Sequence, residues 1–177
     1  MHQRRLIRAA VVAALINSTS ADARVFPTRV VPHRVKDLPV ISVYILDEDV
    51  DSDSSETAPR ELTRNPSVTL ECWVAPGTNV DDAMDDFAEE VENAMDVDPY
   101  FGGTAADSIL NSTVMESLTD SDREIGFLVL SYDVKYRTEP LGLTAPLDDF
   151  NTANTTHNPG GDVHEDDVAT DSITVQV

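Results

Sequence analysis

The chain has 177 residues, of which 41% are hydrophobic, with a single Cys and a formal net charge of −21. This length is typical of one domain, with or without an extended tail, and it allows a packed core. The sequence lacks the run of 18 apolar residues that a membrane-spanning helix needs, and one Cys excludes a disulfide framework and a cysteine-rich zinc site. A wide surface that binds a phosphate backbone is not expected either, since such affinity comes from Lys and Arg.

The charge is distributed unevenly along the chain. Residues 1–40 carry seven Lys/Arg and two acidic residues, whereas residues 41–177 carry five Lys/Arg and 31 acidic residues. The formal charges are therefore +5 and −26, which add up to −21. We expect the basic N-terminal part to meet acidic surface, in the same chain or in a second copy.

The first predicted element is an amphipathic helix over residues 3–17. Its apolar stripe contains Leu6, Ile7, Val11 and Leu15. Three arginines share its polar side: Arg4, Arg5 and Arg8. A secretory signal peptide is the alternative, with an apolar run at 9–16 and a cleavage site at 21–23. Because this run is short and no paired cysteines follow, we favour a helix that belongs to the domain.

Three strand patterns follow the helix. Residues 24–31 predict a short edge strand broken at Pro27, and residues 39–46 predict a strand rich in β-branched residues. Residues 47–57 form an acidic segment that predicts a loop. Residues 67–74 alternate with period two and place Cys72 beside apolar neighbours, which favours a buried, inert thiol over a nucleophile.

A second helix is predicted from Asn79, a good N-cap residue, to about Met95, with acidic residues in its first turns. Residues 99–103 predict a turn, and two strands follow at about 111–118 and 124–137. The second of these strands alternates between one dry face and one mixed face. Together these elements predict an α+β fold, in which a single mixed or antiparallel sheet of about four to five strands packs against two helices.

The composition changes after Pro140. Residues 141–177 are poor in core-forming residues, so we expect a domain over 1–140 and an extended acidic arm over 141–177. The end of the arm, residues 172–177, alternates like a strand through Ile173, Val175 and Val177. Such an end is suited to pairing with a sheet edge on a neighbour, with a disordered solubilising tail as the alternative.

No motif in the sequence supports an enzyme, and no cofactor or metal is expected. His157 and His164 lie among acidic residues, but their spacing matches no metal-binding signature. The acidic run that begins at Asp47 resembles a calcium loop, yet its sixth position is Ser52 rather than Gly and its twelfth is Ala58 rather than Glu. Four carboxylates on one side of the second helix are interpreted as a solvated face rather than an acid/base site: Asp81, Asp85, Glu89 and Glu92.

Several short segments match a known family in the same order along the chain. They are residues 19–30 after an arginine-containing helix, 38–44, 59–62, 81–85 at the start of an acidic helix, 101–103, and 136–138 at the end of a long strand. In this series the chain resembles the tail terminator family of long-tailed phages, also described as minor tail protein U-type or tail completion. About three quarters of the chain is covered. The arm after Pro140 is longer and more acidic than the usual end of that family.

The resemblance implies a structural virion protein that forms a homohexameric ring. Such a ring caps the head-proximal end of the tail tube at the neck, ends tube polymerisation and binds the head-completion or stopper protein. DNA passes through it without specific binding, no membrane is involved, and assembly takes place in the host cytoplasm. Residues expected in subunit or ring contacts are Arg4, Arg5, Arg8, Arg24, Phe26, Arg29, Arg60, Ile173, Val175 and Val177.

Two other functions remain open at this stage: a head–tail connector or stopper, and a secreted acidic binding protein. The acidity itself has two explanations. A channel lined with Asp and Glu repels the DNA duplex and lets it slide, and a salt-rich host environment favours high net charge for solubility. Arg24 and Arg29 are expected to serve structure or subunit contact rather than DNA binding.

Overall fold

A computed structural model describes residues 2–28, 34–51, 61–75, 79–120, 123–138, 152–157 and 169–174. The chain divides into two units, Met1–Pro140 and Leu141–Val177. The first unit contains α1 (Gln3–Leu15), β1 (Val25–Pro27), the 3₁₀ turn η1 (Val35–Asp37), β2 (Val40–Asp51), β3 (Leu62–Val74), α2 (Val80–Asp96), β4 (Asp107–Asp120) and β5 (Arg123–Thr138). The second unit contains β6 (Thr152–His157) and β7 (Ala169–Thr174).

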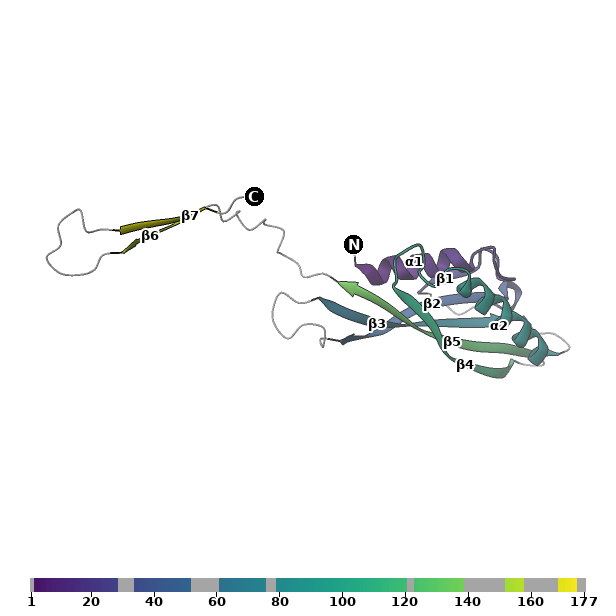
Figure 1. Ribbon diagram of the computed structural model, residues 1–177. Coiled ribbons are helices and arrows are strands. Elements are labelled where there is room, and N and C mark those ends of the chain that lie inside the picture. The colour runs from purple at the N-terminus through teal and green to yellow at the C-terminus, as the bar shows by residue number, and fades with distance from the viewer. Residues whose placement is uncertain are drawn as a thin grey trace. The chain divides into compact units, whose positions relative to one another are not determined.

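The first unit is a two-layer α+β domain. Its five strands form one sheet in the order β1-β2-β3-β5-β4. β1 runs parallel to β2 and the other neighbours are antiparallel, so the sheet is mixed. Figure 1 shows both helices on the same face of the sheet. The expected α+β fold, with one sheet and two helices, is confirmed.

α1 is part of the domain core. Ile7, Val11 and Leu15 recur at every fourth position, which places them on one face of the helix, and all three are fully buried. The helix ends two residues earlier than predicted, where Asn17 takes a left-handed φ of 59°. Cleavage after residue 23 would remove these side chains and the buried Ala21 from the core, so the structure favours the domain helix over a signal peptide.

α2 packs over β5, β3 and β4. Its two ends lie within one residue of the predicted ones. Asp81 and Asp82 lie in its first turn, where carboxylates stabilise the positive end of the helix dipole. The Asn79 side chain bonds Asp82 rather than the helix backbone. The residues that α2 buries are Val80, Met84, Phe87, Ala88, Val91, Ala94 and Met95.

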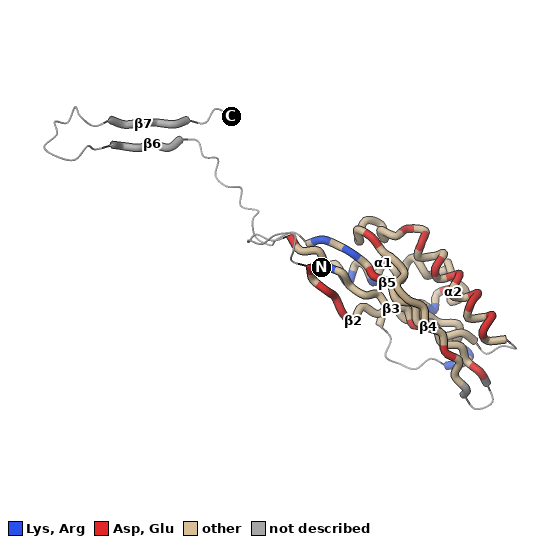
Figure 2. Tube along the Cα trace, turned by 60° about the horizontal axis from the view of Figure 1, so that its bottom comes forward, with Lys and Arg blue, Asp and Glu red and all other residues tan. Residues whose placement is uncertain are grey.

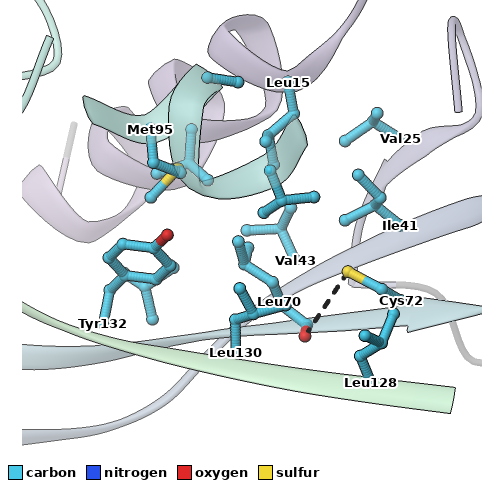
Figure 3. Packing of buried hydrophobic residues seen from close by; sticks show 14 of the residues in the cluster. Leu15, Val25, Ile41, Val43, Leu70, Cys72, Met95, Leu128, Leu130 and Tyr132 are labelled. Atoms are coloured by element: carbon cyan, nitrogen blue, oxygen red, sulfur yellow. Dashed lines mark hydrogen bonds between the residues drawn. The ribbon is translucent and has the colours of Figure 1, made fainter. Parts of the chain in front are cut away.

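The core lies between the sheet and the two helices (Figure 3). On β5, Leu128, Leu130, Tyr132, Val134 and Tyr136 face it, while the alternate residues from Phe127 to Arg137 are half-buried or exposed, as the sequence predicts.

Cys72 of β3 also lies in this core. The side chain is fully buried, and its Sγ lies 3.9 Å from the Leu70 carbonyl oxygen, to which it donates. Burial raises the pKa of the Cys72 thiol above its usual range, with a smaller contribution from the charge of Glu71. A buried thiol that resists ionisation is a poor nucleophile, which agrees with the inert thiol expected from the sequence.

Four strands differ in length from the sequence predictions. β2 continues to Asp51 through the segment predicted as a loop, β3 begins at Leu62 rather than residue 67, and β4 begins at Asp107 rather than 111. β1 is shorter than predicted and ends at Pro27. Neighbouring strands supply backbone partners along the added lengths, and this pairing overrides the low β-propensity of Asp, Asn and Pro.

In the second unit, β6 and β7 form an antiparallel two-stranded sheet in which Ile173 is opposite Ala153. The strand predicted over residues 172–177 is therefore placed at 169–174, and its described partner is in the same chain. Val175 and Val177 lie outside the described residues.

Candidate subunit-contact surfaces

The arginines of α1 lie on the side of the helix that faces away from α2. At 100° per residue, Arg4, Arg8 and Arg5 are turned by about 60°, 100° and 160° from the buried Ile7. The opposite side of α1 carries Ala10, Ala13 and Ala14, which line a groove of about 780 Å³ together with Glu90 and Asn93 of α2 and Val97 just after it. We call Arg4, Arg5 and Arg8 the arginine side of α1.

Two of these three arginines lack a carboxylate partner in the described part of the chain. Arg4 Nη1 lies 3.8 Å from Oε2 of Glu48 on β2, and the Arg4 side chain is 45% exposed. Arg5 is exposed and Arg8 half-buried, and neither forms an ion pair with a described residue. The arginine side therefore retains positive charge that the domain does not neutralise.

α2 presents acidic residues on the side that faces away from α1. The helix has eight acidic residues and no Lys or Arg, and Figure 2 shows red positions along its length. Five carboxylates are turned about the helix axis by about 120° to 200° from the buried Phe87. Glu90 and Asn93 instead turn toward the groove. We call the outer set the acidic side of α2: Asp81, Asp85, Glu89, Glu92 and Asp96.

The two charged sides lie on opposite flanks of the domain. α1 packs over β1 and β2, whereas α2 packs over β5, β3 and β4. β1 and β4 are the two edges of the sheet. One flank is thus positive along its helix and the other is negative.

β4 is an exposed edge strand with apolar side chains. Ile109 is 62% exposed and Val114 51%, and Met115 and Leu118 are also exposed. The strand contains no Lys, Arg or Pro, the residues that commonly protect a sheet edge from pairing. The sequence contains a signal for this surface, since apolar residues occur in both registers of the segment, but β4 is not among the contact surfaces expected above.

Arg24 connects the turn after α1 with the residue before β2. Its Nε donates a 2.9 Å hydrogen bond to the Pro39 carbonyl, and its Nη2 donates a 3.1 Å bond to the Ser20 carbonyl. Arg24 and the half-buried Phe26 line a cavity of about 250 Å³ with Asp37 and Val40. The described hydrogen bonds of Arg24 are thus to backbone carbonyls of its own chain. Of the other expected contact residues, Ile173 lies in β7, and Arg29, Arg60, Val175 and Val177 lie outside the described residues.

Glu48 forms the centre of a polar cluster below α1. Its carboxylate accepts hydrogen bonds from Tyr136 Oη at 2.5 Å and from Arg64 Nη1 at 2.9 Å, and its side chain is 5% exposed. Desolvation by burial raises the pKa of Glu48, but these hydrogen bonds and the charges of Arg4 and Arg64 outweigh it, so the net pKa is lowered. The acidic pattern around residue 48 predicts a loop, so this cluster is not apparent from the sequence.

A second cavity, of about 490 Å³, has acidic walls and includes Lys135. Its acidic residues are Asp47, Asp49, Asp107 and Asp133. Within the described ranges, no group of three or more His, Cys, Asp or Glu is placed to hold a metal ion. Asp47 to Asp51, the start of the calcium-loop resemblance, belong to β2.

The described helices include none that is long and apolar enough to cross a membrane.

Comparisons with known proteins identify the family. A search of curated proteins finds no match. A chain in the virion of a native gene transfer agent particle matches with a TM-score of 0.35 and 16% identity, over 76% of this chain and 92% of that chain. The sequence profile of phage minor tail protein U matches residues 2–136, which span every helix and nearly every strand of the first unit. The chain therefore belongs to the phage minor tail protein U family and is a structural protein of the virion tail.

Proposed function

We propose that six copies of this chain form a ring that caps the head-proximal end of the tail tube. The ring ends tube polymerisation and joins the tail to the head-completion or stopper protein at the neck, after assembly in the host cytoplasm. The observation that carries this proposal is the family match, which covers the folded domain almost from end to end.

The surface of the lone domain supports an assembled state. The sheet edge at β4 is unprotected and carries exposed apolar side chains: Ile109, Val114, Met115 and Leu118. Soluble monomers usually cover such a surface. A flank of each charge sign also favours contact between unlike sides of two copies. Both features are expected of a subunit that is completed by its neighbours.

The charge supports passage of DNA without specific binding. The chain has a formal charge of −21. A ring of such subunits repels the phosphate backbone, so the duplex moves through without sticking. The role proposed is structural rather than catalytic, without a cofactor, and its partners are further copies, the tube protein and the head-completion protein.

Electron cryomicroscopy of the assembled particle tests the proposal. With this chain tagged at its C-terminus, we expect six copies per particle in one ring between tube and head. In a particle that lacks the chain, we expect tubes of uncontrolled length that carry no heads. Five or twelve copies, or a position away from the tube end, would contradict the proposal.

A further inference from the structure

We propose that the arginine side of α1 in one copy docks on the acidic side of α2 in the next copy, and that this contact closes the ring. The inference rests on the proposed ring and specifies which surfaces of the subunit form it. The occupant of each surface is a second copy of the same chain.

Charge complementarity is the first argument. Arg5 and Arg8 have no carboxylate partner among the described residues, in a chain with 33 acidic residues and 12 basic ones. The acidic side of α2 likewise forms no described ion pair, and its carboxylates repel one another at spacings of three and four. Each surface lacks the charge that the other supplies.

Position in the fold is the second argument. The two sides lie over opposite edges of one sheet, so a single copy cannot bring them together. Contact between unlike surfaces is heterologous, the type of contact that generates a closed ring when its rotation closes after a whole number of copies. An isologous dimer through either helix would place like charges opposite each other.

The third argument is the apolar edge. When the α1 flank of one copy meets the α2 flank of the next, the β1–β2 edge of the first approaches the β4 edge of the second. The exposed Ile109, Val114 and Leu118 of β4 are then covered by the neighbour. The arginine contacts fix which surfaces meet, and burial of apolar area on β4 adds stability that salt does not screen.

Charge reversal in the full-length chain tests this contact. In the variant Arg5→Glu/Arg8→Glu, the arginine side changes from +3 to −1, so both flanks are negative. In the variant Asp85→Lys/Glu89→Lys/Asp96→Lys, the acidic side of α2 changes from −5 to +1, so both flanks are positive. Like charges placed opposite each other cost several kcal/mol, so we expect each variant alone to cap tubes at about 100-fold higher concentration than the unmodified chain. Circular dichroism is expected to show an unchanged fold, since none of the reversed residues belongs to the buried core.

Mixing the two variants provides the decisive measurement. A ring in which they alternate restores an opposite pair at every contact, and alternation closes only with an even number of subunits. We expect the equimolar mixture to cap tubes again, with three copies of each variant per ring by native mass spectrometry. Random ratios, or no recovery, would overturn the inference.

A matched control separates this contact from a simple effect of net charge. The variant Lys135→Glu/Arg137→Glu lowers the formal charge by four, as Arg5→Glu/Arg8→Glu does, and its two changes lie at exposed positions of β5. Capping by this variant is expected to be unchanged, and its loss would count against the inference. If both α1 and α2 variants still form six-fold rings, the contact is wrong while the proposed function stands; if the unmodified chain forms no ring on tubes, the proposed function itself fails.

Discussion

The hydroxyl of Tyr136 donates a 2.5 Å hydrogen bond to the carboxylate of Glu48, 88 residues earlier in the chain. The contact joins the end of β5 to the far half of β2, two strands that are separated by β3 in the sheet. Burial, followed by the hydrogen bond to Glu48 and its negative charge, raises the pKa of Tyr136 to about 12. With Arg64 and Arg4, this pair ties β2, β3 and β5 to the start of α1.

Replacing Glu48 by Gln is expected to destabilise the domain by about 2 kcal/mol. The amide keeps an acceptor for Tyr136 but removes the negative charge that Arg64 and Arg4 face. The free energy of unfolding in urea measures the effect. Asp49→Asn is the matched control, since this exposed neighbour in the same strand is expected to change stability by less than about 0.5 kcal/mol.

The same cluster predicts a loss of stability in acid. The folded-state pKa of Glu48 is lowered, so its contribution is present above the unfolded pKa of about 4.3 and is lost as pH falls through the folded pKa. Urea unfolding of the unmodified chain and of Glu48→Gln between pH 7 and pH 3 compares the two. The difference in stability is expected to shrink as pH falls, and a difference that stays constant would contradict the assignment.

Tyr132 and Tyr136 provide a pair of identical substitutions with opposite expected effects. The Tyr132 hydroxyl is buried, and no described residue bonds it. Burial, with the charges of Glu92 and Asp96, raises its pKa well above the usual range. Tyr132→Phe is therefore expected to be neutral or to stabilise by about 1 kcal/mol, whereas Tyr136→Phe is expected to destabilise by about 1 kcal/mol. Thermal unfolding of both variants decides, and equal losses would contradict the prediction.

The region around Glu48 marks the limit of what the sequence alone predicts. Alternation in β5 and the period of four in α1 identify the core correctly, because one face of each element is buried. In β2 the pairing shifts between Ile45 and Glu48. Ile45 packs against the core and Glu48 lies beside Arg4 of α1, so both residues point to the helix side although they are three apart. Such a bulge breaks the period of two, and an acidic stretch beyond it is then indistinguishable from a loop.

The charged flanks are predictable only in part. The sequence places Arg4, Arg5 and Arg8 on one side of a helix and four carboxylates on one side of another. That these sides lie on opposite flanks depends on the strand order, in which β5 inserts between β3 and β4. Local patterns carry no information about that order, so the solvated face expected for α2 gained its proposed role only from the structure.

Gly126 permits the close approach of α2 to β5. A Cβ at this position would lie 2.6 Å from Cγ and 2.9 Å from Sδ of Met84, and 3.1 Å from Cγ1 of Val80. Gly126→Ala is therefore expected to destabilise the domain by about 1–3 kcal/mol. If the clash with Met84 is the cause, the double variant Gly126→Ala/Met84→Ala loses less stability than the sum of the single variants in urea unfolding. Strict additivity would contradict the steric explanation.

The last prediction concerns residues 141–177, which the family match does not include. The segment carries seven acidic residues and no Lys or Arg, and its few apolar residues cannot offset the chain entropy of a separate core. β7 has one edge paired with β6, and its other edge has no described partner. We therefore expect residues 169–174 to pair with a strand edge on an adjacent subunit or ring partner, because main-chain hydrogen bonds are then satisfied on both sides. Deleting residues 150–177 is expected to leave the urea unfolding of the domain unchanged and to reduce the joining of capped tails to heads. A second variant keeps the segment and replaces Ile173 by Asp. It is expected to reduce the joining of tails to heads as well. Normal infectious particles from the deletion would favour a solubilising tail instead.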